Sequence, residues 1–248
     1  MDTFRRLGRA PRPQAYDTEG DRHHRNVQSG GARAAVFGIS DGLVTNVSLI
    51  LGVAGAHPAG GIVRLSGLAG LVAGAFSMAA GELVSMQAQR ELLERELELE
   101  RQALEHSSAA EHQELAAIYV RRGLSPAFAT QLAEMMMRDP KTALETHARE
   151  ELGIDPASLG SPLVAALSSF VTFALGALLP LLPWLVSHGN GALVVSIVVA
   201  AAAAIGVGTI LAALTGRSLL KGAARQLLVA ALAAAVTYGV GRAVGTSV

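Results

Sequence analysis

The stretch GLAGLVAGAFSMAAGELVSMQAQRELLERELELERQALEH, residues 67–106, decides the fold. Its first half is apolar, and its second half consists mainly of Glu, Leu and Arg, with no Gly or Pro between Glu82 and Ser107. This pattern predicts one helix from about 65 to 106. At 1.5 Å per residue the helix is about 60 Å long, roughly twice the hydrocarbon thickness of a bilayer. We therefore expect it to cross a membrane and continue into water.

Apolar segments of similar length recur along the chain. The sequence is 51% hydrophobic and only 16% charged, whereas soluble domains carry about 25% charged residues. Buried core helices of a soluble protein are disfavoured, because too little polar sequence would remain to cover them. We expect an all-α membrane protein with five transmembrane helices, at about 34–56, 65–86, 162–186, 191–215 and 224–244.

The polar sequence falls into two blocks around these spans. The expected domains are an Arg-rich arm at 1–32, the first two spans within 33–86, a helical insert at 87–161 and the last three spans within 162–248. Three to four helices are expected in the insert. A capping box, Ser108 with Glu111, is expected to begin the second of them, Ser125-Pro126 the third and Asp139-Pro140 the fourth.

Positive charges near the span ends predict the orientation. Residues 1–33 carry seven Arg, and the connection between the last two spans carries Arg217, Lys221 and Arg225, whereas the 57–63 and 187–190 connections carry none. We expect the N-terminus and the insert in the cytosol and the C-terminus outside, in the cell membrane. The N-terminus lacks the apolar core of a signal peptide.

Composition also excludes several kinds of chemistry. The chain has no cysteine, so a metal would need carboxylate, imidazole, thioether or carbonyl ligands. No phosphate-binding loop or nucleophile motif is found, and we expect neither an enzyme nor ATP-driven pumping. No separate basic domain supports nucleic-acid binding.

The insert carries the first group of candidate metal ligands. Residues 87–161 hold fourteen acidic and eight basic residues, a net charge of −6. Helices folded back on one another could bring several of these side chains into one pocket for Fe²⁺ or Mn²⁺. A solvated charged face is the alternative that spacing alone leaves open. The candidates are Glu100, Glu111, Glu114, His147, Glu150 and Glu151.

A second group lies in the first two spans. Asp41 is an ionisable residue within the first span, where a charge costs roughly 2.5–3.5 kcal/mol and is a functional candidate by default. Met78 and Glu82 follow one another by one turn in the second span, and a thioether beside carboxylates suits a weakly held cation. The alternative for Met78 is core packing, and the alternative for Asp41 is a buried structural hydrogen bond. Small-residue pairs such as Gly38 and Gly42 indicate either bundle packing or a dimer seam.

Several segments resemble the vacuolar iron transporter family. They are FGISDGLVTNVSLILGV at 37–53, LVAGAFSMAAGELVSMQAQRE at 71–91, ELAAIYVRRGLS at 114–125, AREELGIDP at 148–156 and the opening of the third span from Ser161. The resemblance covers about residues 30–245. It is to a bacterial member without a ferritin-like domain in front, because about 30 residues are too few for one.

The resemblance implies a five-span homodimer that exchanges Fe²⁺, often also Mn²⁺, for protons along a path between the first two spans. It implies path residues Asp41 and Met78, with Glu82 at the inner mouth. It implies that Glu100, Glu111, Glu114 and Glu151 gather metal. Two positions depart from the family pattern: Ala103 replaces a second Glu, for which Glu105 or Glu96 could substitute, and His147 stands where some relatives have methionine.

Together these features predict export of Fe²⁺, or of Mn²⁺, from the cytosol by proton-coupled antiport. The metal is the transported substrate and the proton the coupling ion, and no permanently bound cofactor is expected. The partners expected are a second copy of the chain, the lipid bilayer and divalent metal ions. The alternatives are a Mn²⁺-selective exporter and a membrane-anchored metal sensor or buffer that transports nothing. A di-iron oxidase is disfavoured, since its paired E-x-x-H geometry is missing.

Overall fold

The chain is entirely helical over the part that the computed structural model describes, which is residues 30–57, 59–153 and 160–245. Of the predicted Arg-rich arm, residues 1–29 lie outside this part. The helices of the apolar segments are α1 (Gly30–Gly55), α2 (Gly60–His106), α6 (Pro162–Val186), α7 (Gly189–Leu214) and α8 (Leu219–Gly245). All five are long and apolar enough to cross a membrane, which confirms the expected number of spans. Strands are absent from the described residues.

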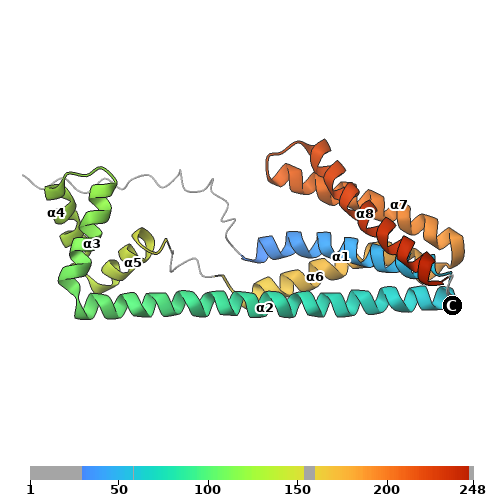
Figure 1. Cartoon of the computed structure of the whole chain (residues 1–248), viewed down its shortest axis with the longest axis horizontal. Helices are drawn as coiled ribbons and strands as arrows, with labels where there is room; N and C mark the ends of the chain where they lie inside the picture. Colours follow the sequence, from blue (N-terminus) through green and yellow to red (C-terminus); the bar gives the residue numbers. More distant parts are fainter. Residues whose placement is uncertain (1–29, 58, 154–159, 246–248) are drawn as a thin grey trace, which may run out of the picture.

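Helix α2 is the longest element and joins the two parts of the molecule (Figure 1). It continues without interruption from the apolar bundle to the insert, as residues 67–106 predicted. Its polar half is closed by the three short helices α3 (Ser108–Arg121), α4 (Pro126–Met136) and α5 (Pro140–Glu150). The insert therefore projects away from the bundle as an independent group of helices on the end of α2.

Helix starts in the insert follow the sequence only in part. Asp139 caps α5 by accepting a hydrogen bond from the Thr142 backbone N–H at 2.9 Å, and a proline follows it at the first helical position. The predicted capping box is wrong, because α3 already includes Ser108. Its N-cap is Ser107, whose side chain makes no capping bond. The helix begins one residue early because the Ser107 N–H still bonds to Ala103 of α2, which leaves a very tight corner.

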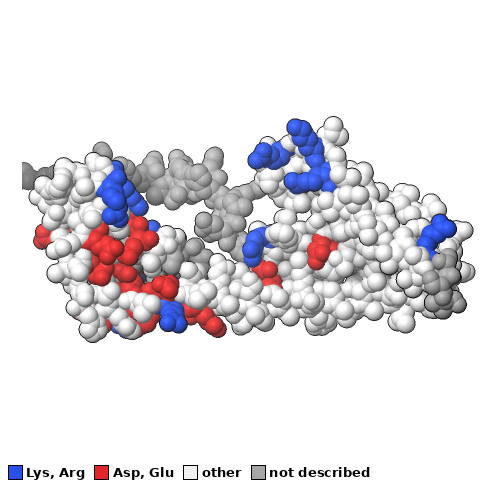
Figure 2. Space-filling model, in the orientation of Figure 1, with Lys and Arg blue, Asp and Glu red and all other residues white. Residues whose placement is uncertain are grey.

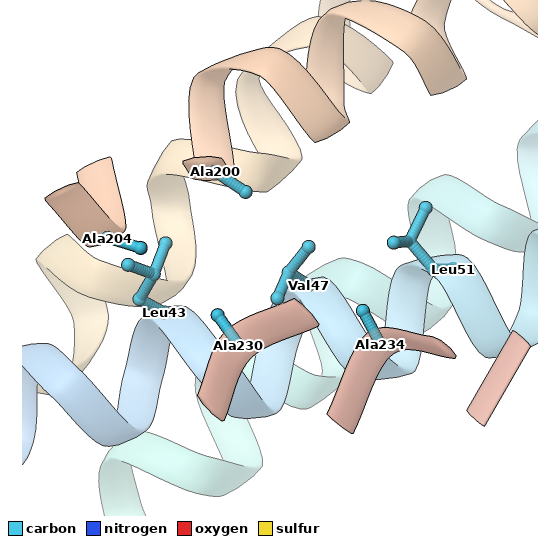
Figure 3. Close-up of a cluster of buried hydrophobic side chains, with 7 residues drawn as sticks. All are labelled: Leu43, Val47, Leu51, Ala200, Ala204, Ala230 and Ala234. Atoms are coloured by element: carbon cyan, nitrogen blue, oxygen red, sulfur yellow. The ribbon is translucent and has the colours of Figure 1, made fainter. Parts of the chain in front are cut away.

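Helix α1 lies at the centre of the apolar bundle and contacts α2, α6, α7 and α8. One core cluster joins it to the last two helices (Figure 3). Alanines on α7 and α8 let the backbones approach closely, as is common between helices in lipid. The buried members of the cluster are Leu43, Val47, Leu51, Ala200, Ala204, Ala230 and Ala234.

The small-residue pairs predicted from spacing serve packing within the chain. A Cβ atom at Gly42 would collide with the Phe173 carbonyl of α6, and one at Gly38 would collide with Thr172. Gly70 and Gly74 of α2 lie against Asn46 and Phe173. These glycines therefore hold α1, α2 and α6 together in one chain.

The outer surface of the bundle is apolar. Large side chains that would be buried in a soluble protein are exposed on every span, and the exposed set on the last three spans includes Leu163, Leu167, Val198, Leu228, Leu232 and Val236. Such a continuous apolar surface is typical of a protein that faces lipid.

Candidate metal centre

Three helices of the insert bring acidic side chains to one point. Glu100 lies near the polar end of α2, and Glu111 lies in the first turn of α3, which folds back after the corner at Ser107. His147 lies in the last turn of α5 and Glu151 is its C-cap, so the two side chains are one turn apart on the same face. Their common location depends on α5 packing against both α2 and α3.

The four side chains are within reach of a single ion. One ligand atom from each lies within 4.8 Å of those of the others. His147 Nδ1 is 3.0 Å from a Glu100 carboxylate oxygen, 3.5 Å from one of Glu151 and 3.7 Å from one of Glu111. The group thus surrounds the ring nitrogen with three carboxylates from three helices.

Burial makes this arrangement expensive without a cation. His147 is fully buried and Glu100 is 8% exposed. Glu100 Oε1 lies close to the His147 ring but has no hydrogen-bond partner, and His147 Nε2 also lacks one. Buried polar atoms are almost always satisfied in folded proteins, so the unpaired Glu100 oxygen beside His147 Nδ1 fits a bound cation at this point.

The electrostatics of the cluster lead to the same conclusion. Burial raises the pKa of Glu100, and the negative charge of Glu151 raises it further, whereas the neighbouring His147 lowers it. Burial also raises the pKa of Glu111, against the opposite effect of His147. Figure 2 shows the acidic residues gathered on the insert. A divalent cation bound among these side chains would remove the repulsion that makes their ionisation costly.

Three carboxylates and one imidazole form a mixed oxygen and nitrogen donor set. Such a set suits first-row divalent ions such as Fe²⁺ and Mn²⁺, and the absence of thiolate does not favour soft ions such as Cu⁺. Because all four candidate ligands come from one chain, a partner subunit is not needed to bring them together.

Comparisons with known proteins show the family to which the chain belongs. The sequence profile of the VIT family matches residues 32–242. The chain belongs to the VIT family. It is 36% identical over 229 residues to the vacuolar iron transporter of Acanthamoeba castellanii, a match covering 90% of this chain and 82% of the relative. It is 30% identical over 228 residues to vacuolar iron transporter 1 of Oryza sativa, with 90% of both chains covered.

A third relative, vacuolar iron transporter 1 of Arabidopsis thaliana, is 28% identical over 207 residues, which cover 83% of each chain. VIT family membership confirms the resemblance inferred from the sequence motifs. It makes this chain a membrane transporter rather than an enzyme, and it supports metal transport as the activity.

Two of the insert residues predicted from sequence lie outside the cluster of this VIT protein. Glu114 is exposed on α3, although its negative charge contributes to the raised pKa values of Glu100 and Glu111. Glu150 forms an ion pair with Arg122 instead. Of the two expected substitutes for the missing family Glu, Glu105 is paired with Arg101 and Glu96 is exposed.

The residues predicted for the membrane path do not form a comparable group. Asp41 is exposed on α1, where it accepts a hydrogen bond from Thr45 one turn later at 3.0 Å. Met78 is half-buried and packs against a cluster of Ala75, Phe173 and Ala177. Among the described residues, a group of three or more potential His, Asp or Glu ligands occurs only in the insert.

The structure adds two polar contacts that sequence reasoning missed. Glu82 of α2 accepts a hydrogen bond at 3.0 Å from Arg33 of α1, and Asn46 donates to the Ala177 carbonyl at 2.6 Å while its own side-chain oxygen has no partner. The Arg33–Glu82 contact could have been predicted from the sequence. Consecutive spans run in opposite directions, so the first residues of one span lie beside the last residues of the next.

Proposed function

We propose that the chain exports Fe²⁺, and also Mn²⁺, from the cytosol in exchange for protons. The observation that carries this proposal is the buried cluster of Glu100, Glu111, His147 and Glu151, with two orphaned polar atoms in a group suited to a divalent ion. The names of the relatives, vacuolar iron transporters, support iron as the first metal.

The proposed orientation places the insert in the cytosol, where it would collect the metal. Arg217 lies in the α7–α8 connection, and Lys221 and Arg225 lie in the first turns of α8. These positive charges support a cytosolic location for the connection. With five spans, the N-terminus and the insert are then on the same side as this connection, and the C-terminus lies outside. In this orientation the site has direct access to cytosolic metal ions.

The proposed route follows α2 from the insert into the membrane. Glu100 and Glu82 lie on the same helix, about 27 Å apart at 1.5 Å per residue. Metal released from the cluster would enter at Glu82 and pass Met78 and Asp41 before leaving on the far side. Between Glu100 and Glu82 the ion would have to move along the polar part of α2. The acidic side chains of the insert give this region a negative potential that attracts cations.

A homodimer would complete the membrane part of the route. Asp41 is exposed in a single chain although it lies within a span. An ionised carboxylate that faces lipid is costly, and such residues normally face a protein interior or a water-filled cavity. A second copy packed against this face of α1 would provide that environment and bring two Asp41 side chains to one path.

Protons are the proposed coupling ion because the path is lined by carboxylates. Protonation of a carboxylate weakens its hold on a metal ion, so protons that enter from outside would favour release there.

Flux measurements in proteoliposomes test this proposal. Purified protein is reconstituted into vesicles, and uptake of Fe²⁺ is followed under anaerobic conditions. The uptake is compared with and without a proton gradient that drives protons out of the vesicles as the metal enters. Uptake that depends on the protein and is accelerated by the gradient is the expected result. Metal binding without flux would instead indicate a membrane-anchored sensor or buffer. Competition between Fe²⁺ and Mn²⁺ in the same assay measures the preference between the two metals.

A further inference from the structure

The inner ends of the first two spans are joined by one ion pair. Arg33 Nη2 lies 3.0 Å from a Glu82 carboxylate oxygen, with hydrogen-bond geometry. The Glu82 side chain is 18% exposed, whereas the Arg33 side chain is 56% exposed. The carboxylate is therefore largely enclosed, and the guanidinium covers it from the more open side.

The helices around this pair are held in place independently of it. Ala34, Met86 and Ala165 form a buried cluster that joins α1, α2 and α6 at the same level. Two of the three are close to the pair in sequence: Ala34 follows Arg33, and Met86 lies four residues after Glu82. Because packing fixes the backbones, the Arg33 side chain can leave Glu82 without separating α1 from α2.

We propose that Arg33 is the counter-ion that holds Glu82 in the metal-free protein, and that a divalent ion entering the path displaces its guanidinium. This inference rests on the proposed function, because it takes Glu82 to be the entry ligand. Arg33 is then a positioning residue: it keeps the enclosed carboxylate neutralised and oriented while the path is empty, and it sets the metal concentration needed for entry.

The strength of the pair is suited to this role. An ion pair with one exposed partner is partly screened by water and adds little net stability. A doubly charged ion competes well against such a contact, while a permanently buried pair would resist displacement. The exposed side of Arg33 also gives the released guanidinium a route into water or toward lipid phosphates.

Equilibrium binding of Mn²⁺, followed by electron paramagnetic resonance of the free ion, tests the inference without any need for transport. The full-length protein carries Glu100→Gln and His147→Gln in all samples, so that the insert site is silent. In this background Arg33→Gln is expected to tighten Mn²⁺ binding by about fivefold, the upper value for loss of such a pair. Glu82→Gln should abolish this binding, and Arg33→Gln with Glu82→Gln should not regain it.

Two further variants separate this role from a purely structural one. Arg217→Gln removes a positive charge from the α7–α8 connection and should leave Mn²⁺ affinity unchanged, which controls for surface potential. The exchange of the two residues, Arg33→Glu with Glu82→Arg, keeps an ion pair between the helices. It should preserve folding, as judged by size-exclusion chromatography, but lose metal binding because the enclosed carboxylate is gone.

The inference is overturned if Arg33→Gln leaves the affinity unchanged, or if the gain persists without Glu82. If Arg33→Gln does not fold, Arg33→Lys takes its place. A single ammonium holds a carboxylate less rigidly than a guanidinium, so tighter binding is again expected. In flux assays the half-saturating Fe²⁺ concentration should fall by a similar factor at constant maximal rate. A further outcome is that Arg33→Gln tightens Mn²⁺ binding as expected while the wild-type protein shows no metal flux. That combination would refute the transport proposal and leave the counter-ion role of Arg33 intact.

Discussion

The insert and the membrane bundle treat their acidic side chains differently. In the insert, three glutamates and a histidine from three helices converge, and Glu100 Oε1 and His147 Nε2 have no hydrogen-bond partner. In the bundle, Glu82 is paired with Arg33, Asp41 is held by Thr45 of its own helix, and Met78 packs against α6. The insert gathers its candidate ligands at one point, whereas each candidate in the bundle is paired, hydrogen-bonded within its own helix or packed against a neighbouring helix.

The difference indicates which part of the proposed transport route one folded chain can form by itself. Folding of a single chain is sufficient to bring the four candidate ligands of the insert together, because all of them belong to that chain. For the proposed membrane path we propose a further step, which is pairing with a second copy and displacement of Arg33. Binding and flux should therefore respond to different mutations, and the following predictions test that separation.

The largest effect is expected at Asp41. Asp41→Asn should reduce Fe²⁺ flux at least about 100-fold, because it removes the proposed intramembrane charge that both metal and proton use. Metal binding by the insert should remain as in the wild type. Thr45→Val removes only the hydrogen bond to Asp41 and should have a much smaller effect on flux. Full transport by Asp41→Asn would show that the path runs elsewhere.

The next largest effect concerns the insert ligands. Glu100→Gln and His147→Gln should each weaken metal binding by at least about tenfold, since even changes to groups behind the ligands cost 10–100-fold at metal sites. Isothermal titration calorimetry on the full-length protein measures this. Flux should fall at low metal concentration and recover at high concentration, because the membrane path is intact.

Glu114→Gln and Glu150→Gln are the matched controls for this prediction, since both residues are acidic and close in sequence to ligands but lie outside the cluster. Each should weaken binding by less than about threefold, the modest effect expected of a more distant or already paired charge. A loss at Glu114 as large as that at Glu111 would extend the site to a fifth ligand.

A smaller effect is expected on the stability of the metal-free protein. Burial raises the pKa values of Glu100 and Glu111 above the usual glutamate value, so the folded state binds more protons than the unfolded state in that pH range. Stability should therefore fall as the pH rises through this range. Glu100→Gln should raise the apparent melting temperature at pH 7.5 by about 2–4 °C in the presence of a chelator.

In chelator the melting temperature of Glu100→Gln should lie above that of the wild type. Added metal should stabilise the wild type more than Glu100→Gln and so reverse the order of the two melting temperatures. Thermal unfolding in detergent at pH 5 and pH 7.5, with and without Mn²⁺, checks both statements. A wild-type protein whose melting temperature rises with pH in chelator would contradict the assigned cause.

The smallest effect is expected at the start of α5. Asp139→Ala removes a helix cap and should cost about 1 kcal/mol of stability. Hydrogen bonds from the Thr142 backbone and hydroxyl lower the pKa of Asp139, so its contribution is present above the ordinary aspartate pKa and is lost as the pH falls through the lowered value. Because α5 carries His147, metal affinity should fall slightly, and Thr142→Ser, which keeps both bonds, should not change it.

The sequence alone predicted the elements of this protein well. Five spans, the uninterrupted α2 and the cap at Asp139 all depend on local composition, since an apolar segment of sufficient length must satisfy its backbone hydrogen bonds as a helix in lipid. The capping box at Ser108 was wrong because the corner between α2 and α3 is set by a backbone bond to the preceding helix.

The selection of ligands from among the candidates required the tertiary structure. Helical periodicity places His147 and Glu151 on one face, but it does not show that Glu100 and Glu111 meet them while Glu114 and Glu150 do not. Likewise, the sequence places Arg33 at the start of the first span and Glu82 near the end of the second, and only packing decided that the two side chains pair. Hydropathy is a sum over neighbouring residues, whereas a contact between distant residues depends on how whole helices pack, and that information is spread over the entire chain.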